Sequence, residues 1–392
     1  MDKAGERMNV RRYFDNAATT YPKPEDVYQA MDETARLLGV NAGRGGYENA
    51  RQASRLIEAT KQQVLQFVEA QTEAKVVFTA SATLAMNLVI GGIEWKDSDV
   101  VYISPFEHNA VARTLHAYQK KWGFSILELP ISEERLQIDL DKTEYAFVKN
   151  PPAYIFMSHV SNVTGYILEI EEVSRMARSH GAKIVVDASQ SCGLLPIDVR
   201  KGDIDIVVFA GHKTMYGPFG VAGFVNNTGM ALHSFLYGGT GTDSLNLDMP
   251  DGEERWEPGS PNVVAISGLR AGLSYLQEHE QVEQQERELT QYLVSRLENV
   301  PHVRLYLPSD RNRHISMVAF NIEGYKSDEV GMILDQDYGI EVRTGYHCAP
   351  LIHKYLKDKD SLGVVRASIG CFTTKEDVDA LIDAVKELAE EG

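Results

Sequence analysis

The sequence predicts an α/β fold built on a mostly parallel sheet, and three observations support this prediction. Short apolar runs alternate with helix-length amphipathic segments, the runs are apolar nearly throughout, and 392 residues with 43% apolar content suffice for a large core. Strands of this kind are typical of a parallel sheet that helices cover on both faces. The expected strands are Val76–Thr79, Val100–Ile103, Tyr154–Met157, Ile184–Val186, Ile204–Phe209 and Val221–Val225.

A second, smaller domain is expected at the C-terminus, because a chain of this length usually divides into two domains. The turn at Gly259–Asn262 precedes a long helical pattern, roughly Val264 to Glu298. A smaller αβ segment follows, with expected strands at Val303–Tyr306, Ile315–Phe320 and Val364–Ser368 and a closing helix near Lys375–Glu390. We therefore predict a large domain over residues 15–262 and a small α/β domain over 263–392, with residues 1–14 packing on the small domain.

The composition excludes several classes of function. A formal charge of −17 and a pI near 5.1 argue against binding to nucleic acid or to anionic membranes. No apolar run approaches the ~20 residues of a membrane span, and the N-terminus lacks the apolar core of a signal peptide. We expect a soluble, cytoplasmic protein. The three cysteines, Cys192, Cys348 and Cys371, form neither a disulfide framework nor a zinc-binding spacing, so we predict no metal.

Two strand ends carry residues that indicate a cofactor. Lys213 follows the strand Ile204–Phe209 at once, and Asp187 closes the run Ile184–Val186 with Gln190 three residues later. Taken alone, such a lysine is usually a solvated loop residue and such an aspartate a helix N-cap. In a parallel sheet, however, both strand ends reach the same edge, where ligands bind. A lysine amine that holds an aldehyde and a carboxylate that keeps a ring nitrogen protonated are the requirements of pyridoxal 5'-phosphate (PLP).

A phosphate site is expected where an apolar strand turns into a helix. The segment Thr79–Thr83 leads directly into the helical run Leu84–Ile90. Free backbone N–H groups and the helix dipole favour an anion at such a helix start.

Six runs, in chain order, resemble the class V aminotransferase fold and, more closely, the cysteine desulfurases. The resemblance covers nearly the whole chain and implies the PLP-dependent transferase fold type I, with a mostly parallel seven-stranded sheet in the large domain. Cys348 precedes Arg366 by eighteen residues, which is similar to the group II (SUF-type) branch that includes selenocysteine lyases. The runs are Tyr13–Thr20, Ser161–Gly165, Val186–Gln190, Ala210–Lys213, Glu257–Asn262 and Arg343–Ala349.

The resemblance assigns roles around the cofactor. Lys213 would hold PLP and move protons on the substrate carbons, Asp187 would pair with the ring nitrogen, and Gln190 would hydrogen-bond the phenolate oxygen. His108 would stack on the ring and relay a proton, and Asn162 would lie near the phenolate and the substrate carboxylate.

Further positions match the family's phosphate and carboxylate contacts. Thr83 and His212 match phosphate contacts, and Ser260 would reach the phosphate from a second subunit of a homodimer. Arg366 matches the anchor of the substrate carboxylate, which suits a planar guanidinium. Arg343 and Arg44 match secondary positions, with Arg44 donated across the dimer. The chain departs from many relatives at three positions, with Ala210 for serine, Ala82 for threonine and Gly43 for histidine.

Cys348 separates the reaction types. An aminotransferase needs no thiol beside the ring, whereas a desulfurase needs a thiolate that attacks the substrate sulfur and leaves as a persulfide. Arg343 and His347 are candidate positive charges beside this thiolate, and Cys192 and Cys371 are expected to be buried structural cysteines. The sequence thus favours a homodimeric PLP enzyme that converts L-cysteine to L-alanine and passes sulfur from Cys348 to an acceptor protein.

Three alternatives stay open on the sequence. A selenocysteine lyase acting on L-selenocysteine would use the same residues and release selenium. A class V aminotransferase or lyase would carry Cys348 without using it. A catalytically silent PLP-fold scaffold is disfavoured by intact Lys213, Asp187 and Cys348.

Overall fold

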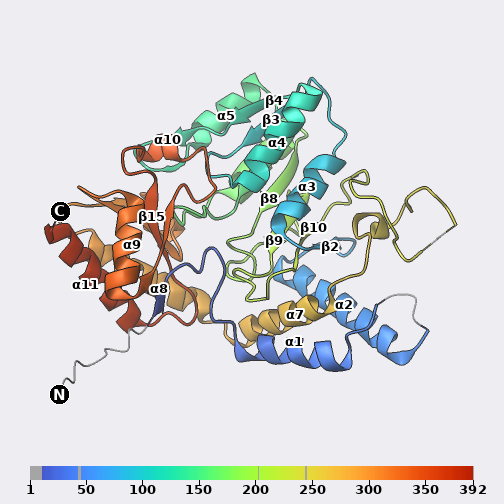
Figure 1. The fold of residues 1–392 in the computed structure, drawn as a ribbon. Helices are drawn as coiled ribbons and strands as arrows, with labels where there is room; N and C mark the ends of the chain where they lie inside the picture. The colour runs from blue at the N-terminus through green and yellow to red at the C-terminus, as the bar shows by residue number, and fades with distance from the viewer. Residues whose placement is uncertain (1–10, 43–45, 202, 243–244, 392) are drawn as a thin grey trace, which may run out of the picture.

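The computed structural model describes residues 11–42, 46–201, 203–242 and 245–391, and its centre is a seven-stranded sheet (Figure 1). The strand order is β2-β10-β9-β8-β7-β3-β4. Only β10 runs antiparallel to its neighbours in this sheet, so the prediction of a mostly parallel seven-stranded sheet is confirmed. The strands are β2 (Lys75–Thr79), β3 (Val100–Ile103), β4 (Ser125–Glu128), β7 (Tyr154–Ser158), β8 (Lys183–Asp187), β9 (Ile206–Ala210) and β10 (Ala222–Asn226).

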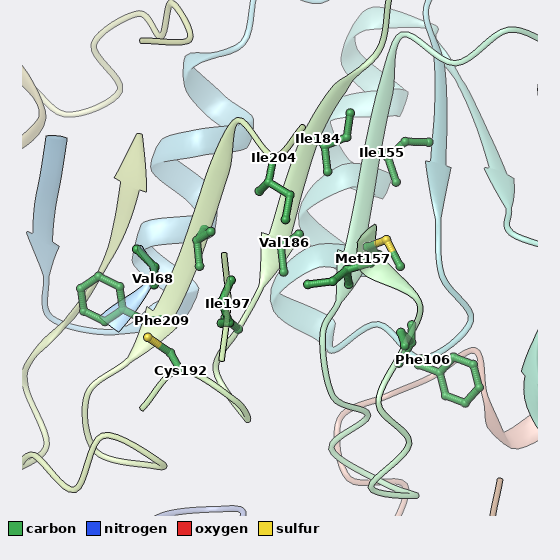
Figure 2. Close-up of a cluster of buried hydrophobic side chains, with 14 of the residues drawn as sticks. Val68, Phe106, Ile155, Met157, Ile184, Val186, Cys192, Ile197, Ile204 and Phe209 are labelled. Atoms are coloured by element: carbon green, nitrogen blue, oxygen red, sulfur yellow. The ribbon is translucent and has the colours of Figure 1, made fainter. Parts of the chain in front are cut away.

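Both faces of this sheet are covered by helices, which explains why its strands read as continuous apolar runs. One face packs against α3 and α4, and the other packs against α2, α5, α6 and α7. Figure 2 shows part of the core between the large sheet and the second group of helices, in which Met157, Val186 and Phe209 point to the same side as Cys192. The helices are α2 (Glu48–Phe67), α3 (Ala82–Gly92), α4 (Asn109–Trp122), α5 (Leu140–Lys149), α6 (Ile170–Ser179) and α7 (Val263–Glu278).

A second, four-stranded antiparallel sheet with the order β11-β12-β15-β14 forms the small domain. Helices α8, α9 and α11 bury its core, to which Phe14 of the N-terminal segment also belongs. The short strand β1 (Arg12–Tyr13) pairs with β13 (Ile340–Glu341) beside it. The strands are β11 (Val303–Tyr306), β12 (Met317–Ile322), β14 (Arg343–Gly345) and β15 (Val364–Ser368), and the helices are α8 (Val282–Leu297), α9 (Ser327–Tyr338) and α11 (Lys375–Glu391).

The long helix expected over Val264–Glu298 is wrong, because the chain forms two helices there. Helix α7 ends at Glu278, and α8 begins at Val282. The first packs against α2 and against α1 (Glu25–Leu37), next to the large sheet, whereas the second belongs to the core of the small sheet (Figure 1). The break between them allows each helix to pack in its own core. The domain boundary at residue 262 stays a prediction, as does the docking of residues 1–14, of which 1–10 lie outside the described residues.

The remaining elements connect these layers. A two-stranded hairpin joins β5 (Ile131–Ser132) to β6 (Gln137–Ile138), and α10 (His353–Leu356) follows β14. Short 3-10 turns lie at Glu253–Trp256 and Arg311–Arg313. In the described part of the chain, each helix is too short or too polar to cross a membrane.

Candidate active site

A cavity of about 240 Å³ lies where the carboxyl edge of the large sheet meets the small sheet. It brings together most of the side chains that the sequence analysis singled out, although they come from separate strands, helices and loops. The predicted site residues that line it are Thr83, His108, Asn162, Asp187, Gln190, His212, Lys213, Arg343, Cys348 and Arg366.

Neighbouring parallel strands deliver the first wall of the cavity. Ser158 and Asp187 are the last residues of β7 and β8 and lie opposite each other in the register. Ala210 ends β9, the next strand, and Lys213 follows it within one turn. Because parallel strands end at a common edge, the acid and the amine reach the same cavity.

Lys213 is partly buried and lines the cavity. Burial lowers its pKa from the usual 10.5 to about 8, against the opposing influence of the Asp187 carboxylate. The nearby charges of Arg366 and Arg343 lower the same pKa further. With a pKa of about 8, roughly a tenth of this amine is unprotonated at pH 7. The unprotonated amine is the form that attacks an aldehyde.

His108 caps the N-terminus of α4 and faces the cavity. Its Nδ1 accepts a hydrogen bond from the Ala110 N–H at 3.0 Å. Burial lowers the pKa of its imidazole to about 4, and the positive charge of Lys213 adds to this effect. The ring is therefore neutral at pH 7, and since Nδ1 is an acceptor, its proton sits on Nε2.

His212 lies beside Lys213 with its ring stacked on Phe219, at 4.6 Å between ring centroids. Burial, followed by the charges of Lys213 and Lys23, lowers the pKa of His212 to about 3. The ring is therefore neutral at pH 7 and offers one donor and one acceptor nitrogen. The backbone carbonyl of His212 accepts a hydrogen bond from the Lys23 ammonium at 2.6 Å.

The start of α3 forms the end of the cavity where a phosphate is expected. Ser81 caps this helix, and its Oγ accepts a hydrogen bond from the Leu84 N–H at 3.2 Å. Ala82 and Ala210, the two positions at which the family resemblance implied a missing hydroxyl, both line the cavity. The sequence analysis did not assign Ser189, although it stands between Asp187 and Gln190 and lines the same cavity.

Two buried polar atoms at this wall are unsatisfied within the described residues. They are the Ser189 Oγ and the His212 Nδ1. The Ser189 N–H itself donates to the Asp187 Oδ1 at 2.9 Å, which holds the carboxylate in place. Because buried polar atoms are rarely left unpaired, these two indicate a polar ligand in the cavity.

The small sheet supplies two arginines from adjacent strands. Arg343 on β14 and Arg366 on β15 lie directly opposite each other in the antiparallel register. Arg366 is only 2% exposed; its Nη1 donates to the Asn162 carbonyl oxygen at 2.6 Å and its Nη2 to the Asp15 Oδ1 at 2.7 Å. The sequence analysis missed Asp15, although it lies in the quoted run Tyr13–Thr20.

Cys348 is exposed and lies on a short loop with an unusual backbone. Both His347 and Cys348 have left-handed φ angles, 45° and 56°. The Cys348 carbonyl accepts a hydrogen bond from the Asn109 N–H at 2.7 Å, and the His347 carbonyl accepts one from the Asn162 side chain at 2.7 Å. These bonds tie the loop to the large domain, and they use the Asn162 amide that was expected near the phenolate.

His347 does not supply the positive charge that the sequence analysis considered for it. Its Nε2 donates to the Val364 carbonyl at 3.0 Å, so the ring is turned into the small sheet. Burial and the charge of Arg366 hold the pKa of this imidazole well below its ordinary range. The ring is therefore neutral at pH 7, and Arg343 remains as a cation of the cavity wall.

One predicted residue, Ser260, does not line this cavity. Ser260 is exposed, and its Oγ accepts a weak hydrogen bond from Asn41 at 3.4 Å. Arg44 lies outside the described residues, as does Gly43. The predicted roles of Ser260 and Arg44 across a dimer stay predictions.

The other two cysteines are buried, and among the described residues no group of His, Cys, Asp and Glu could hold a metal ion. Burial raises the pKa of the Cys192 thiol and that of the Cys371 thiol to about 12. Neither thiol is ionised at neutral pH, which leaves Cys348 as the accessible one.

Glu107 is a buried carboxyl group directly behind the cavity wall that the sequence analysis did not assign. It accepts hydrogen bonds from the Ser104 hydroxyl and from the N–H and hydroxyl of Ser158, the latter two at 2.6 and 3.2 Å. Burial, followed by the nearby charge of Asp187, raises the pKa of Glu107 from 4.5 to about 8 against its hydrogen bonds. A raised pKa of this kind makes the stability of the fold depend on pH.

The sign of this dependence gives a testable prediction. The folded protein keeps the Glu107 proton up to about pH 8, whereas the unfolded chain releases it near 4.5. The stability that this proton contributes is complete below pH 4.5 and is lost as the pH rises to about 8. The unfolding free energy of the wild type minus that of Glu107→Gln should therefore decrease from pH 5 to pH 8. Both free energies are measured by urea unfolding without cofactor. Each unit of pKa difference corresponds to about 1.4 kcal/mol.

The matched control is Glu144→Gln, which removes an exposed carboxylate on α5. The difference in unfolding free energy between this variant and the wild type should not change with pH. If the Glu107→Gln difference is equally constant from pH 5 to pH 8, Glu107 is ionised throughout and the explanation is wrong.

Comparisons with known proteins agree with this geometry. The model of the "Aminotransferase class-V" family matches residues 12–381. A probable cysteine desulfurase of Pyrococcus abyssi is 32% identical over 96% of this chain and 94% of its own length. A cysteine desulfurase of Escherichia coli O157:H7 is 31% identical over 96% of this chain and 93% of its own.

Solved structures are similar over the same extent. The apo structure of a cysteine desulfurase from Thermococcus onnurineus has a TM-score of 0.90 at 30% identity and covers 98% of this chain and 96% of its own. The Escherichia coli cysteine desulfurase CsdA has a TM-score of 0.84 at 27% identity, with the same coverage. The sheet order, the partly buried lysine at the end of β9 and these similarities together place the chain in the class V aminotransferase family, as a member of its cysteine desulfurases.

Proposed function

We propose that this protein is a PLP-dependent cysteine desulfurase that converts L-cysteine to L-alanine and keeps the sulfur on Cys348 as a persulfide. One observation carries the proposal: an accessible thiol, Cys348, lies on the same cavity as Lys213, Asp187 and Arg366. A transamination would need the lysine, the aspartate and the arginine, but it has no use for the thiol.

The cavity fits PLP, the cofactor of this family. The Lys213 amine, with its lowered pKa, would hold the aldehyde, and the Asp187 carboxylate, oriented by the Ser189 N–H, would pair with the ring nitrogen. The unsatisfied Ser189 Oγ and His212 Nδ1 are available to the polar edge of the cofactor, together with the N-terminus of α3. When bound, PLP supplies the electron sink that makes the bonds at the substrate α-carbon reactive.

The residues of the chain bind and orient the substrate around that sink. Arg366 holds the substrate carboxylate, because its buried guanidinium offers a planar pair of donors. Lys213 Nζ takes the proton from the α-carbon in its neutral form and returns it to the product. His108 contributes a neutral ring with its proton on Nε2, and this ring would stack on the cofactor and relay protons. Gln190 is already oriented, since its Nε2 donates to the Ala17 carbonyl at 2.8 Å.

Sulfur transfer belongs to Cys348. Its thiolate attacks the sulfur of L-cysteine, so that the S–S bond of a persulfide forms while the C–S bond of the substrate breaks. The carbon that loses sulfur gains a proton, which completes L-alanine, and no outside oxidant or reductant is needed. The loop is tied through Asn109 and Asn162, so the persulfide stays at the mouth of the cavity and an acceptor protein would come to it.

L-Selenocysteine is the second candidate substrate, because the same residues would act on it. The test is to measure alanine together with sulfide or selenide from each amino acid, with and without a thiol reductant. A desulfurase yields alanine from L-cysteine in equal amount to sulfide. Alanine from L-selenocysteine alone identifies a selenocysteine lyase, and formation of a keto acid in place of alanine identifies an aminotransferase.

Ser260 and Arg44 are proposed to complete the site of a partner subunit in a homodimer. The support for Ser260 is its position: it is exposed and lies off the cavity of its own chain. A hydroxyl at the Pro-Gly-Ser-Pro turn is thus free to reach a phosphate in the second subunit.

Hybrid dimers test this arrangement. Ser260→Asp should place a negative charge against the partner's phosphate and so lower activity, and Lys213→Ala should be inactive. When both variants are co-expressed with different tags, the hybrid dimer carries one site with Lys213 and Ser260 both intact. It should recover about half of the wild-type activity per dimer.

The two homodimers from the same co-expression are the controls and should stay inactive or strongly impaired. Full activity of Ser260→Asp alone, or a purified hybrid no more active than the homodimers, contradicts the shared site.

A further inference from the structure

Asp15 occupies one edge of the guanidinium that the proposed function assigns to the substrate carboxylate. Its Oδ1 accepts from the Arg366 Nη2 at 2.7 Å, and its Oδ2 lies 3.9 Å from the Arg343 Nη1. The carboxylate is 23% exposed, whereas Arg366 is 2% exposed. One acidic side chain thus contacts both arginines at the small-sheet side of the cavity.

The backbone places Asp15 there rigidly. The neighbouring Phe14 carbonyl accepts a hydrogen bond from the Ser368 N–H at 2.7 Å, and the Ala17 N–H donates to the Ser368 Oγ at 2.9 Å. The Asn16 side chain donates to the Ser368 carbonyl at 3.0 Å. Ser368 ends β15, two residues after Arg366, so the anchor and the carboxylate share one support.

The register explains why a carboxylate is needed at this point. Arg343 and Arg366 lie directly opposite each other on neighbouring strands, and like charges in that position repel. With Asp15 between them, the three groups carry a net charge of about +1, which one substrate carboxylate neutralises. Without Asp15 the net charge would be about +2, which suits a ligand with two negative charges.

We propose that Asp15 is a specificity-determining residue that sets this pocket to accept amino acids with one negative charge and to reject those whose side chain is also anionic. It does so by cancelling one of the two arginine charges while it holds the Arg366 guanidinium against the Asn162 carbonyl. The Nε of Arg366 is buried without a partner among the described residues. This side of the guanidinium therefore has a donor available for the substrate carboxylate. The inference rests on the proposed function, in which Arg366 binds the carboxylate of an amino acid.

The test compares two ligands that lack a thiol and differ in side-chain charge. L-Alanine has a neutral side chain, and L-aspartate carries a carboxylate where L-cysteine carries sulfur. Dissociation constants of both are measured by calorimetry on the PLP-loaded wild type, Asp15→Asn, Asp15→Glu and Glu341→Gln. The last variant removes an exposed carboxylate of the same small domain that lies on β13 and ion-pairs with Arg11.

For Asp15→Asn, the ratio of the L-aspartate to the L-alanine dissociation constant should fall about tenfold, because one unit of negative charge is removed at close range. Asp15→Glu and Glu341→Gln should keep the wild-type ratio within about twofold. If Asp15 has a purely structural role, Asp15→Asn would weaken the binding of both ligands alike and leave the ratio of dissociation constants constant. That result would overturn the proposal. Thermal unfolding of each variant identifies a loss of folding.

Arg366→Lys separates failure of this inference from failure of the proposed function. If Arg366→Lys weakens both ligands while Asp15→Asn leaves the ratio unchanged, the anchor stands and the role of Asp15 is wrong. If Arg366→Lys leaves both dissociation constants unchanged, Arg366 is not the anchor, and the inference fails with that part of the proposed function.

Discussion

Lys213→Ala should lose covalent attachment of the cofactor and at least about 1,000-fold in the rate of L-alanine formation. Lys213 supplies both the amine that holds PLP and the base that moves the α-proton, and the described cavity offers no second lysine in its lining. Attachment is measured by borohydride reduction followed by mass spectrometry of the intact chain. The wild type should gain the mass of the reduced cofactor, and the variant should not.

Lys201→Ala serves as the control, because Lys201 is exposed and pairs only loosely with Glu171 at 3.7 Å. It should attach PLP and turn over substrate as the wild type does. The yellow colour of the purified wild-type protein should accompany the covalent form. A reduced, covalently modified Lys213→Ala chain would show that another amine holds the cofactor, and the assignment of this site would fail.

Cys348→Ala should lose at least about 100-fold in turnover of L-cysteine and still bind the amino acid within about threefold of the wild-type affinity. Lys213, Asp187 and Arg366 remain in place, so binding survives while the attack on sulfur is lost. The substitution adds no backbone strain, because alanine and cysteine meet the same restriction at a φ of 56°. Alanine release measures turnover, and the absorbance change of the bound cofactor measures binding.

Cys348→Ser is the matched variant, because the serine side chain has about the size of the thiol but lacks its sulfur chemistry. It should be as inactive as Cys348→Ala. L-Selenocysteine provides a second readout: selenium leaves more readily than sulfur, so lyase activity on this substrate should persist in both variants. In the wild type, a single cycle with L-cysteine should leave one additional sulfur on Cys348. Undiminished turnover of L-cysteine by Cys348→Ala would make the thiol a bystander and reduce the protein to a class V aminotransferase or lyase.

Much of the fold could be predicted from local patterns. Strands β3, β11 and β15 begin and end at the predicted residues, because their apolar runs are bounded by polar or turn residues. Strand β4 was missed, since Ser125–Glu128 is a short edge strand with only part-buried apolar residues. The break between α7 and α8 was also missed, because the helical pattern continues through residues 279–281 and only the two separate cores require the chain to turn.

The candidate site was likewise predictable only in part. Residue type and position after a strand were enough to predict Lys213 and Asp187, since parallel strands bring their carboxyl ends to one edge. Cys348 was predicted from the family resemblance, and only the structure places it on the same cavity. Asp15 and Glu107 could not be assigned from the sequence, because their significance comes from contacts with Arg366 and with Ser158, far along the chain. Ser189 could not be assigned either, because only the structure shows that its hydroxyl is buried without a partner in the described residues. The neutral state of His347 likewise depends on its burial against Val364 and Arg366.

The sequence by itself determined the α/β class, most strands of the large sheet, and the residue types that this chemistry requires, because these follow from hydrophobic periodicity and from motifs of a few residues. The tertiary structure decided how those residues are charged and held. Burial lowers the pKa of Lys213, the register sets Arg343 against Arg366, and Asp15 reaches both from the far end of the chain. Desolvation and charge pairing act through space, so they depend on packing between segments that the linear order of residues does not specify.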